Sequence, residues 1–247
     1  MKAIVLAGGY AKRMWPLTLE TPKQLLPIAG KPMIDYVIEE LELIDDIDKI
    51  YVSTNQKFGK KFQDFFNNRE NKKQVEIFIE PSVCEEDKLG SIGALNLLIK
   101  AEGIDEETLI IGGDNLFEFK MVDLIKHLEH KGTNVIVLDK VETLDEAKLF
   151  GVAEVDKHHK VISFEEKPEH PKSTLVATAC YILTKKGIEE VSKYLEQGGE
   201  PDKMGHFIQW LCKNDDVHAF TFHGKWFDIG STELYHEADE YFKKKFG

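Results

Sequence analysis

The sequence begins with a short apolar segment that ends at two consecutive glycines. Residues 2–7 are mostly aliphatic or β-branched, and Gly8 and Gly9 follow directly. A buried strand that leads into a glycine turn lets backbone N–H groups approach a ligand closely, and adjacent N–H groups form an anion-binding concavity. Arg13 and Lys23 follow within a short loop. This opening predicts a triphosphate site, although a plain turn after a strand would also account for the glycines.

Two common phosphate-binding motifs do not fit this loop. The dinucleotide fingerprint needs G-x-G-x-x-G at the start of a helix, and residues 10–13 break that pattern. The P-loop needs G-x-x-x-x-G-K followed by Ser or Thr, whereas Pro32 follows Gly30 and Lys31 here. Phosphate binding by this loop must therefore use another arrangement.

Apolar segments alternate with helical periodicity along the first 140 residues. Such alternation predicts an α/β fold with a doubly wound, mostly parallel sheet that is covered on both faces. Ligands of these sheets bind at the carboxyl ends of strands, where the 8–9 turn and residues 112–115 both lie. The expected strands are 2–7, 49–54, 75–80, 108–114 and 134–138, and the expected helices are 32–44, 58–69, 90–102 and 121–130.

After residue 140 the pattern becomes richer in strands. Residues 151–155 and 161–165 alternate apolar and polar side chains around a turn, which predicts a β-hairpin. No linker-like composition separates the two halves, so we expect a single domain over 1–247, with a first half at 1–140, an inserted β-rich portion at 141–230 and a closing helix at 231–247. The other expected elements are strands at 175–183 and 217–222 and helices at 186–197 and 203–213.

Composition excludes several classes of protein. The formal net charge is −12 over 247 residues, whereas binding to nucleic acid phosphates needs a basic face. Three scattered cysteines (Cys84, Cys180 and Cys212) have neither zinc-site spacing nor an even disulfide framework, which favours reduced thiols. No apolar segment approaches the ~20 residues of a membrane span, and no signal peptide pattern is present. We expect a cytoplasmic protein that binds neither nucleic acid nor membrane.

The first 34 residues contain an extended motif. The pattern L-A-G-G-x-x-x-R-(M/L)-x-P-L-T, then P-K-x-L-L-P and K-P-(M/L)-I, is matched by residues 6–9, 13, 16–18, 22–27 and 31–34. This motif resembles the signature of the sugar-1-phosphate nucleotidyltransferases, a family that includes glucose-1-phosphate thymidylyl- and uridylyltransferases and mannose-1-phosphate guanylyltransferases. The resemblance implies a Rossmann-like nucleotidyltransferase fold, with the glycine loop around a nucleoside triphosphate and with Arg13 and Lys23 against its phosphates. Lys12 departs from the usual Gly, Ser or Thr, so a hydroxyl contact is lost there.

By the same resemblance, two aspartates hold Mg²⁺. Asp114 ends an expected strand, and Asp228 precedes the closing helix. A carboxylate at a strand end is suited to hold Mg²⁺ against phosphate oxygens. The residues alone leave alternatives open, because G-D-N is also ordinary turn chemistry and an isolated aspartate can cap a helix. The family ligates its metal with the aspartates of both motifs, so the role of metal ligand is carried onto Asp114 and Asp228.

The second half resembles the sugar-phosphate part of the family. Residues 150–152, 164–168 and 177–179 resemble its F-G-V, E-E-K-P and (V/A)-T-G segments. The resemblance implies that Glu166 accepts hydrogen bonds from sugar hydroxyls and that Lys167 pairs with the 1-phosphate as a point charge. Ala179 replaces a frequent glycine, which leaves the sugar open. The residues assigned to the sugar phosphate are Asn115, Gly151, Glu166, Lys167 and Thr178.

Recognition of the base is assigned to residues 80–93. Thymidylyl- and uridylyltransferases often have a glutamine near the first part of this segment, where Glu80 or Ser82 stands here, and a glycine further on, which Gly90 retains. Gln24 lies in a K-Q-L-L-P segment common in thymidylyltransferases, which favours dTTP or UTP with glucose 1-phosphate; mannose-1-phosphate guanylyl transfer is the alternative. The residues assigned to the nucleotide are Leu6, Ala7, Gly8, Gly9, Gln24, Ser82 and Gly90.

The implied reaction is a Mg²⁺-dependent transfer that gives an NDP-sugar and pyrophosphate. The sugar-1-phosphate oxygen attacks the α-phosphorus in line, and because it is already an anion the reaction needs no general base. Positioning and electrostatic stabilisation are then the main contributions to catalysis. The residues expected to act in catalysis are Arg13, Lys23, Asp114 and Lys167.

Two alternatives from other classes agree less well with the sequence. A non-catalytic sugar-nucleotide sensor or regulatory subunit of the same fold should have lost the charged residues of the site, and they are present. A nucleotide-dependent dehydrogenase should have the G-x-G-x-x-G fingerprint, which is missing. The chain is expected to be a short form without the C-terminal β-helix of larger members, and the sequence leaves open whether it forms a homo-oligomer.

Overall fold

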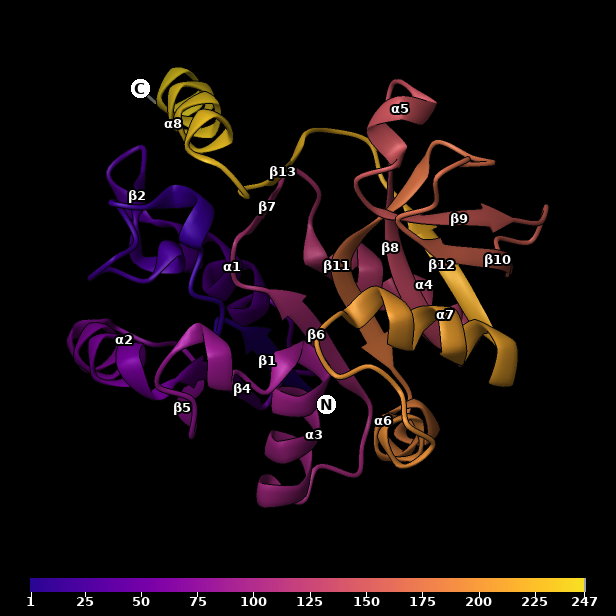
Figure 1. Ribbon diagram of the computed structural model, residues 1–247, viewed down its shortest axis with the longest axis horizontal. Coiled ribbons are helices and arrows are strands. Elements are labelled where there is room, and N and C mark those ends of the chain that lie inside the picture. Colours follow the sequence, from indigo (N-terminus) through magenta and orange to yellow (C-terminus); the bar gives the residue numbers. More distant parts are fainter. Residues whose placement is uncertain (247) are drawn as a thin grey trace.

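The computed structural model describes residues 1–246, apart from the side chains of residues 127–131. Within this part of the chain the centre is a nine-stranded mixed sheet with the order β10-β9-β11-β6-β1-β4-β5, in which β8 pairs with β11 and β12 pairs with β8. In Figure 1 the elements β1, β4, β5, α1 and α2 lie on the left, and the strands β8 to β12 lie on the right. The predicted α/β fold with a large, mostly parallel sheet in the first half is confirmed.

The parallel part of the sheet is built around β1 (Lys2–Leu6). This strand lies between β4 (Lys49–Asn55) and β6 (Thr108–Gly112), and β5 (Gln74–Glu80) continues the sheet beyond β4. All these pairings are parallel, so the carboxyl ends of the strands meet at one edge. The glycine turn and the ends of β4, β5 and β6 are therefore neighbours.

Helices cover the sheet on both faces, as doubly wound α/β folds require. Along β1, Ala3 and Val5 join one hydrophobic core, and Ile4 joins the other. No helix among the described residues combines the length and apolar character needed to cross a bilayer. The first core receives α1 (Met33–Glu42), α2 (Gln56–Asn68) and α4 (Met121–Lys131), and the second receives α3 (Gly90–Glu102), α6 (Lys185–Glu196) and α7 (Met204–Asn214).

Antiparallel strands extend the sheet in the second half. The predicted hairpin is present as β9 (Gly151–Val155) and β10 (Val161–Glu166). The long strand β11 (Leu175–Leu183) joins the halves by pairing with β6 and with β8 (Asn134–Lys140), and β12 (Val217–Thr221) lies parallel beside β8. The register of β11 against β8 shifts after Ala177, where Ala179 adopts the left-handed region with φ 53°. Glycine would adopt this conformation without strain.

A small two-stranded ribbon was not predicted. It consists of β7 (Asn115–Phe117) and β13 (Trp226–Asp228), which are antiparallel. Asp228 therefore ends a strand and is not a helix cap. The cap of α8 (Thr232–Phe246) is Ser231, whose Oγ accepts a hydrogen bond from the Leu234 amide at 3.3 Å. The remaining short elements are η1 (Lys12–Met14), η2 (Lys23–Leu25), β2 (Pro27–Ile28), β3 (Lys31–Pro32), η3 (Glu85–Asp87) and α5 (Leu144–Ala147).

Helix α8 returns to the first half of the chain and lies beside β2 (Figure 1). The Tyr235 hydroxyl donates to the Pro27 carbonyl at 2.7 Å, and the Ala29 amide donates to Asp239 at 2.8 Å. Phe242 is buried in a third core together with residues of the N-terminal loop and of β13. The closing helix thus holds β13 against the loop that follows β1.

We predict that Glu118 stabilises the packing of α8 and that this stabilisation depends on pH. Its carboxylate accepts hydrogen bonds from the Tyr241 hydroxyl, the Lys245 ammonium and the Lys225 amide, at 2.5–2.6 Å. The ion-paired hydrogen bond from Lys245 contributes most to lowering the pKa of Glu118 from its ordinary 4.5 to about 2. Because the folded pKa is depressed, the stabilisation is present above pH 4.5 and is lost as the pH falls toward 2.

Glu118→Gln should therefore lower the Tm by about 2–4 °C at pH 7, and the difference from wild type should shrink between pH 4.5 and pH 3. Thermal unfolding followed by circular dichroism measures both effects. The matched control is Glu240→Gln, at an exposed position on α8. A Tm difference that is constant from pH 7 to pH 3 would contradict the assignment.

Candidate functional site

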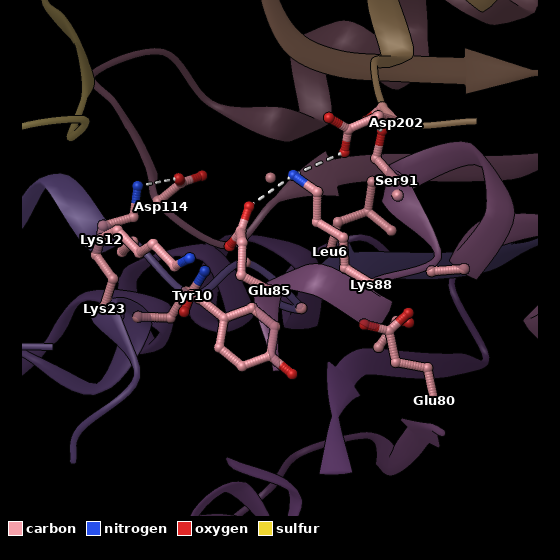
Figure 2. A pocket seen from close by; sticks show the side chains of 18 of the residues that line it. Leu6, Tyr10, Lys12, Lys23, Glu80, Glu85, Lys88, Ser91, Asp114 and Asp202 are labelled. Carbon is pink, nitrogen blue, oxygen red and sulfur yellow. Dashed lines mark hydrogen bonds and ion pairs between the residues drawn. The ribbon is translucent and has the colours of Figure 1, made fainter. Parts of the chain in front are cut away.

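A cavity of about 530 Å³ opens at the carboxyl edge of the parallel strands (Figure 2). Its volume lies within the range of small-molecule sites. The loop after β1, the ends of β4 and β5, the turn after β6 and the start of α3 surround it. Of the residues predicted for the site, those that line the cavity are Leu6, Gly8, Gly9, Arg13, Lys23, Gln24, Gly90 and Asp114.

The backbone of the glycine loop is fixed by side chains from the next strand. The Asn55 amide donates to the Gly8 carbonyl at 2.8 Å, and the Thr54 hydroxyl donates to the Ala7 carbonyl at 3.2 Å. Replacing Gly8 by a larger residue would require the Glu80 side chain to move, because a Cβ at this position would lie 2.8 Å from Oε1 of Glu80. The loop therefore keeps its N–H groups in place and leaves room for the end of β5.

Lys23 is a nearly buried cation with two partners. Its side chain is 11% exposed. The ammonium donates to the Ile229 carbonyl and forms an ion pair with Asp114, both at 2.5 Å. Figure 2 shows the pair at one end of the cavity. Two predicted residues, the triphosphate lysine and a metal-binding aspartate, are thus in direct contact.

The ribbon of β7 and β13 brings the second aspartate to the first. Its register pairs Asp228 with Asn115, the residue that follows Asp114. The Trp226 indole donates to Asn115 at 2.7 Å and holds the two strands together. Burial raises the pKa of Asp228, the negative charge of Asp114 raises it further, and nearby cations oppose both effects. The cations that act on Asp228 are Lys23, Arg13 and Lys167.

The pair of aspartates fits a divalent cation. The negative charges of Asp114 and Asp228 repel each other, and a bound Mg²⁺ would relieve that repulsion. The described residues contain no group of three or more His, Cys, Asp or Glu side chains that could hold a metal by themselves. A donor set of two carboxylates is typical of Mg²⁺, which takes its other ligands from substrate phosphates and water.

Arg13 reaches the same end of the site from η1. One guanidinium nitrogen lies 3.0 Å from the position of a Cβ at Gly230, so the absence of a side chain at this glycine makes room for it. The preceding residue, Lys12, also lines the cavity and forms an ion pair with Glu86 of η3 at 3.1 Å. The substitution of the usual small residue by Lys12 therefore adds a contact between the glycine loop and the 80–90 segment.

None of the residues predicted for the sugar phosphate lines this cavity. Oε2 of Glu166 lies 3.1 Å from the position of a Cβ at Gly151, and a Cβ at Gly205 would overlap the same carboxylate. Lys167 has a left-handed backbone with φ 48° and lies close enough to Asp228 to lower its pKa. Two glycines thus leave space for the Glu166 carboxylate, and the residue that follows it, Lys167, lies within electrostatic reach of Asp228.

Three predicted site residues have their polar groups engaged or buried outside the cavity. Asn115 is 2% exposed and bound to the Trp226 indole. The Thr178 hydroxyl donates to the Val137 carbonyl at 3.1 Å and is fully buried. Ser82 is also fully buried, with its hydroxyl on Glu80. In the described structure these side chains position neighbouring segments.

The sequence did not predict that the segment around Asp202 packs against the start of α3. The Ser91 hydroxyl donates to the Asp202 carbonyl, 111 residues along the chain, at 2.8 Å. Gly90, at φ 75°, has no room for a Cβ because the Asp202 backbone lies against it. Lys88 pairs with Glu85 and with Asp202 (Figure 2). In the sequence, Gly90 was the only sign of this contact, and a glycine by itself does not indicate which segment packs against it.

These features define an α/β protein in which a glycine loop, Lys23 and Asp114 line a cavity at the carboxyl edge of the sheet, with Asp228 close to them. A family model described as Nucleotidyl transferase matches residues 2–245. The chain belongs to this nucleotidyl transferase family, and the resemblance seen in the sequence is confirmed.

Relatives and solved structures agree with this assignment. The chain is 31% identical over 99% of its length to a bifunctional protein GlmU of Methanocaldococcus jannaschii, and 30% identical over 93% to a putative mannose-1-phosphate guanyltransferase of Sulfolobus acidocaldarius. It spans 55% and 60% of those proteins. A putative glucose-1-phosphate thymidylyltransferase of Bacillus anthracis superposes with a TM-score of 0.80 at 25% identity, covering 98% of this chain and 95% of that one.

We predict that Lys23→Met weakens the binding of nucleoside triphosphates by about 10- to 100-fold, because a charge-assisted contact with phosphate is lost and Asp114 is left without its cation. Isothermal titration with GTP and UTP in the absence of metal measures the effect. Lys60→Met, at a largely exposed position on α2, should change the affinity less than twofold. Equal affinities of the Lys23 variant and the wild type would show that this lysine does not contact the phosphates.

Proposed function

We propose that the protein transfers a nucleoside monophosphate from an NTP to a hexose 1-phosphate and releases pyrophosphate. The observation that carries this proposal is the meeting of Lys23, Asp114 and Asp228, from three separate segments, beside a glycine loop with fixed backbone N–H groups. In this proposal residues 1–140 bind the nucleotide and residues 141–230 bind the sugar phosphate. Membership of the nucleotidyl transferase family supports the reaction class.

The chemistry needs charge neutralisation more than proton transfer. A sugar-phosphate oxygen is already an anion, so the protein must hold two negatively charged substrates together and stabilise the charge that builds on the phosphates. In this proposal Arg13 stabilises the departing pyrophosphate, Lys23 the triphosphate and Lys167 the incoming 1-phosphate. A Mg²⁺ ion held by Asp114 and Asp228 would neutralise phosphate oxygens when bound.

The non-catalytic alternative is less well supported by the site. A sensor has no need to keep cations and carboxylates in contact, yet the Lys23–Asp114 pair is assembled and Asp228 lies within its electrostatic reach. The resemblance in the sequence favours dTTP or UTP and glucose 1-phosphate, with mannose-1-phosphate guanylyl transfer as the alternative. The relatives carry names with different nucleotides, so they support the reaction class and leave the base to be read from the site.

A pyrophosphate-release screen tests the proposal. Five NTPs are crossed with glucose, mannose, galactose and N-acetylglucosamine 1-phosphates in the presence of Mg²⁺. We expect release with at least one pair and its loss in excess EDTA. Turnover that persists in EDTA would remove the metal from the proposal, and no release with any pair would favour the sensor.

Asp114→Ala should reduce kcat by about 10³-fold or more, because the metal loses one of its two protein ligands and Lys23 loses its partner. Steady-state pyrophosphate release with the best substrate pair measures the loss. Asp123→Ala, at an exposed position on α4, is the control and should keep wild-type activity. A kcat within tenfold of wild type for the Asp114 variant would refute its role.

Lys167→Ala should raise the KM for the sugar phosphate by about 10- to 100-fold and leave the KM for the NTP within about twofold, because its charge is assigned to the incoming phosphate alone. Lys172→Ala, an exposed lysine a few residues further on, is the control. If the KM for the NTP rose as much as the KM for the sugar phosphate, Lys167 would have to be reassigned to the triphosphate.

A further inference from the structure

Three buried side-chain oxygen atoms in the described part of the chain have no hydrogen-bond partner, and the residues that carry them all line one cavity. They are Oε1 of Gln24, Oγ of Ser53 and Oε2 of Glu80. Buried polar atoms in folded proteins are nearly always paired, so a cluster of unpaired ones at a cavity indicates groups that await a ligand. Two of the three, on Gln24 and Glu80, are acceptors.

Glu80 is the one residue of this set whose side chain is a carboxyl group. It ends β5, is 3% exposed, and occupies the space that a side chain at Gly8 would fill. Oε1 accepts a hydrogen bond from the Ser82 hydroxyl at 3.2 Å, and that hydroxyl lies 3.4 Å from the Tyr10 hydroxyl. One carboxylate oxygen is therefore fixed by the protein, and the other is left unpaired.

Among the described residues no cation is paired with the Glu80 carboxylate. Burial raises the pKa of Glu80, and the negative charge of Asp87 also raises it. In Figure 2 Glu80 lies across the cavity from Lys23 and Asp114, at the end away from the phosphate-binding cations. A ligand that extends from those cations reaches Glu80 with its uncharged end, and for a nucleotide that end is the base.

We propose that Glu80 makes the site selective for guanine nucleotides, with its carboxylate accepting the N1–H and the exocyclic N2 amino group of guanine. This inference rests on the proposed function, since it identifies the nucleotide of that same site. Guanine is the one common base whose Watson–Crick edge presents two adjacent N–H donor groups. A carboxylate matches that pair as a bidentate acceptor, just as it matches the paired donors of an arginine.

Other bases fit a carboxylate less well. Uracil and thymine present a single N–H between two carbonyl oxygens, so the second carboxylate oxygen would face another acceptor. Adenine and cytosine present one amino group beside a ring nitrogen that is itself an acceptor. A site built to pair polar groups rejects ligands that leave one of them buried and unpaired. Glutamine at this position would instead offer one acceptor and one donor, which suits uracil or thymine.

The test measures kcat/KM for pyrophosphate release with GTP, ITP, UTP, dTTP, ATP and CTP at a saturating hexose 1-phosphate. Wild type should prefer GTP over UTP and dTTP, and should prefer GTP over ITP by about 10-fold or more, because inosine keeps N1–H and lacks the N2 amino group. The comparison of GTP with ITP uses the unaltered protein and does not depend on the folding of any variant.

Glu80→Gln should lower kcat/KM for GTP and raise it for UTP and dTTP, so that the GTP-to-UTP ratio falls by about 100-fold, and it should remove the discrimination between GTP and ITP. Glu76→Gln, on the same strand and outside the cavity, is the matched control and should keep the wild-type ratio. Circular dichroism confirms that both variants are folded.

The outcomes separate this inference from the proposed function. Turnover by the wild type with UTP or dTTP preferred over GTP would overturn the role of Glu80 and leave the reaction intact. No pyrophosphate release with any pair would overturn the reaction, and titration of wild type with GDP, IDP and UDP would then test Glu80 by binding alone. Equal affinities for GDP and IDP would refute the guanine contact in that case.

Discussion

The structure of the site depends on one nearly buried ammonium group, that of Lys23. Its two partners come from distant parts of the chain, because Asp114 follows β6 and Ile229, 206 residues away, follows β13. A buried cation without a partner is costly, so each of these segments limits where the others can lie. The N-terminal loop, the turn after β6 and the entry to α8 are therefore positioned together, and the two aspartates are positioned with them.

A rigid sheet makes this arrangement possible. The parallel strands alternate side chains into two separate cores and end together at one edge, so the side chains at their carboxyl ends are held by packed elements. The cavity has two electrostatically different ends as a result. Cations and aspartates meet at one end, and Glu80, which is paired with no cation among the described residues, lies at the other. The proposed nucleotide requires this polarity, because its phosphate end is charged and its base is rich in N–H donors.

Much of the fold was predictable, because the strands and helices of the first half carry clear periodicity and the hairpin β9–β10 alternates regularly. The ribbon β7–β13 was not predictable. Each of its strands has three residues, and each is specified by the other rather than by its own sequence. The same holds for Asp228, whose local sequence is equally compatible with a helix cap, and whose place beside Asp114 follows only from the register of the ribbon.

The periodic elements, the glycine turn and the set of charged residues can be read from the sequence, because these depend on neighbours along the chain. Which groups face one another depends on the packing of distant segments. The contact of the Asp202 backbone with Gly90 joins residues over a hundred positions apart, and the unpaired oxygen of Glu80 is evident only once its surroundings are known. Burial and pairing are properties of packed neighbours, and no local pattern encodes them.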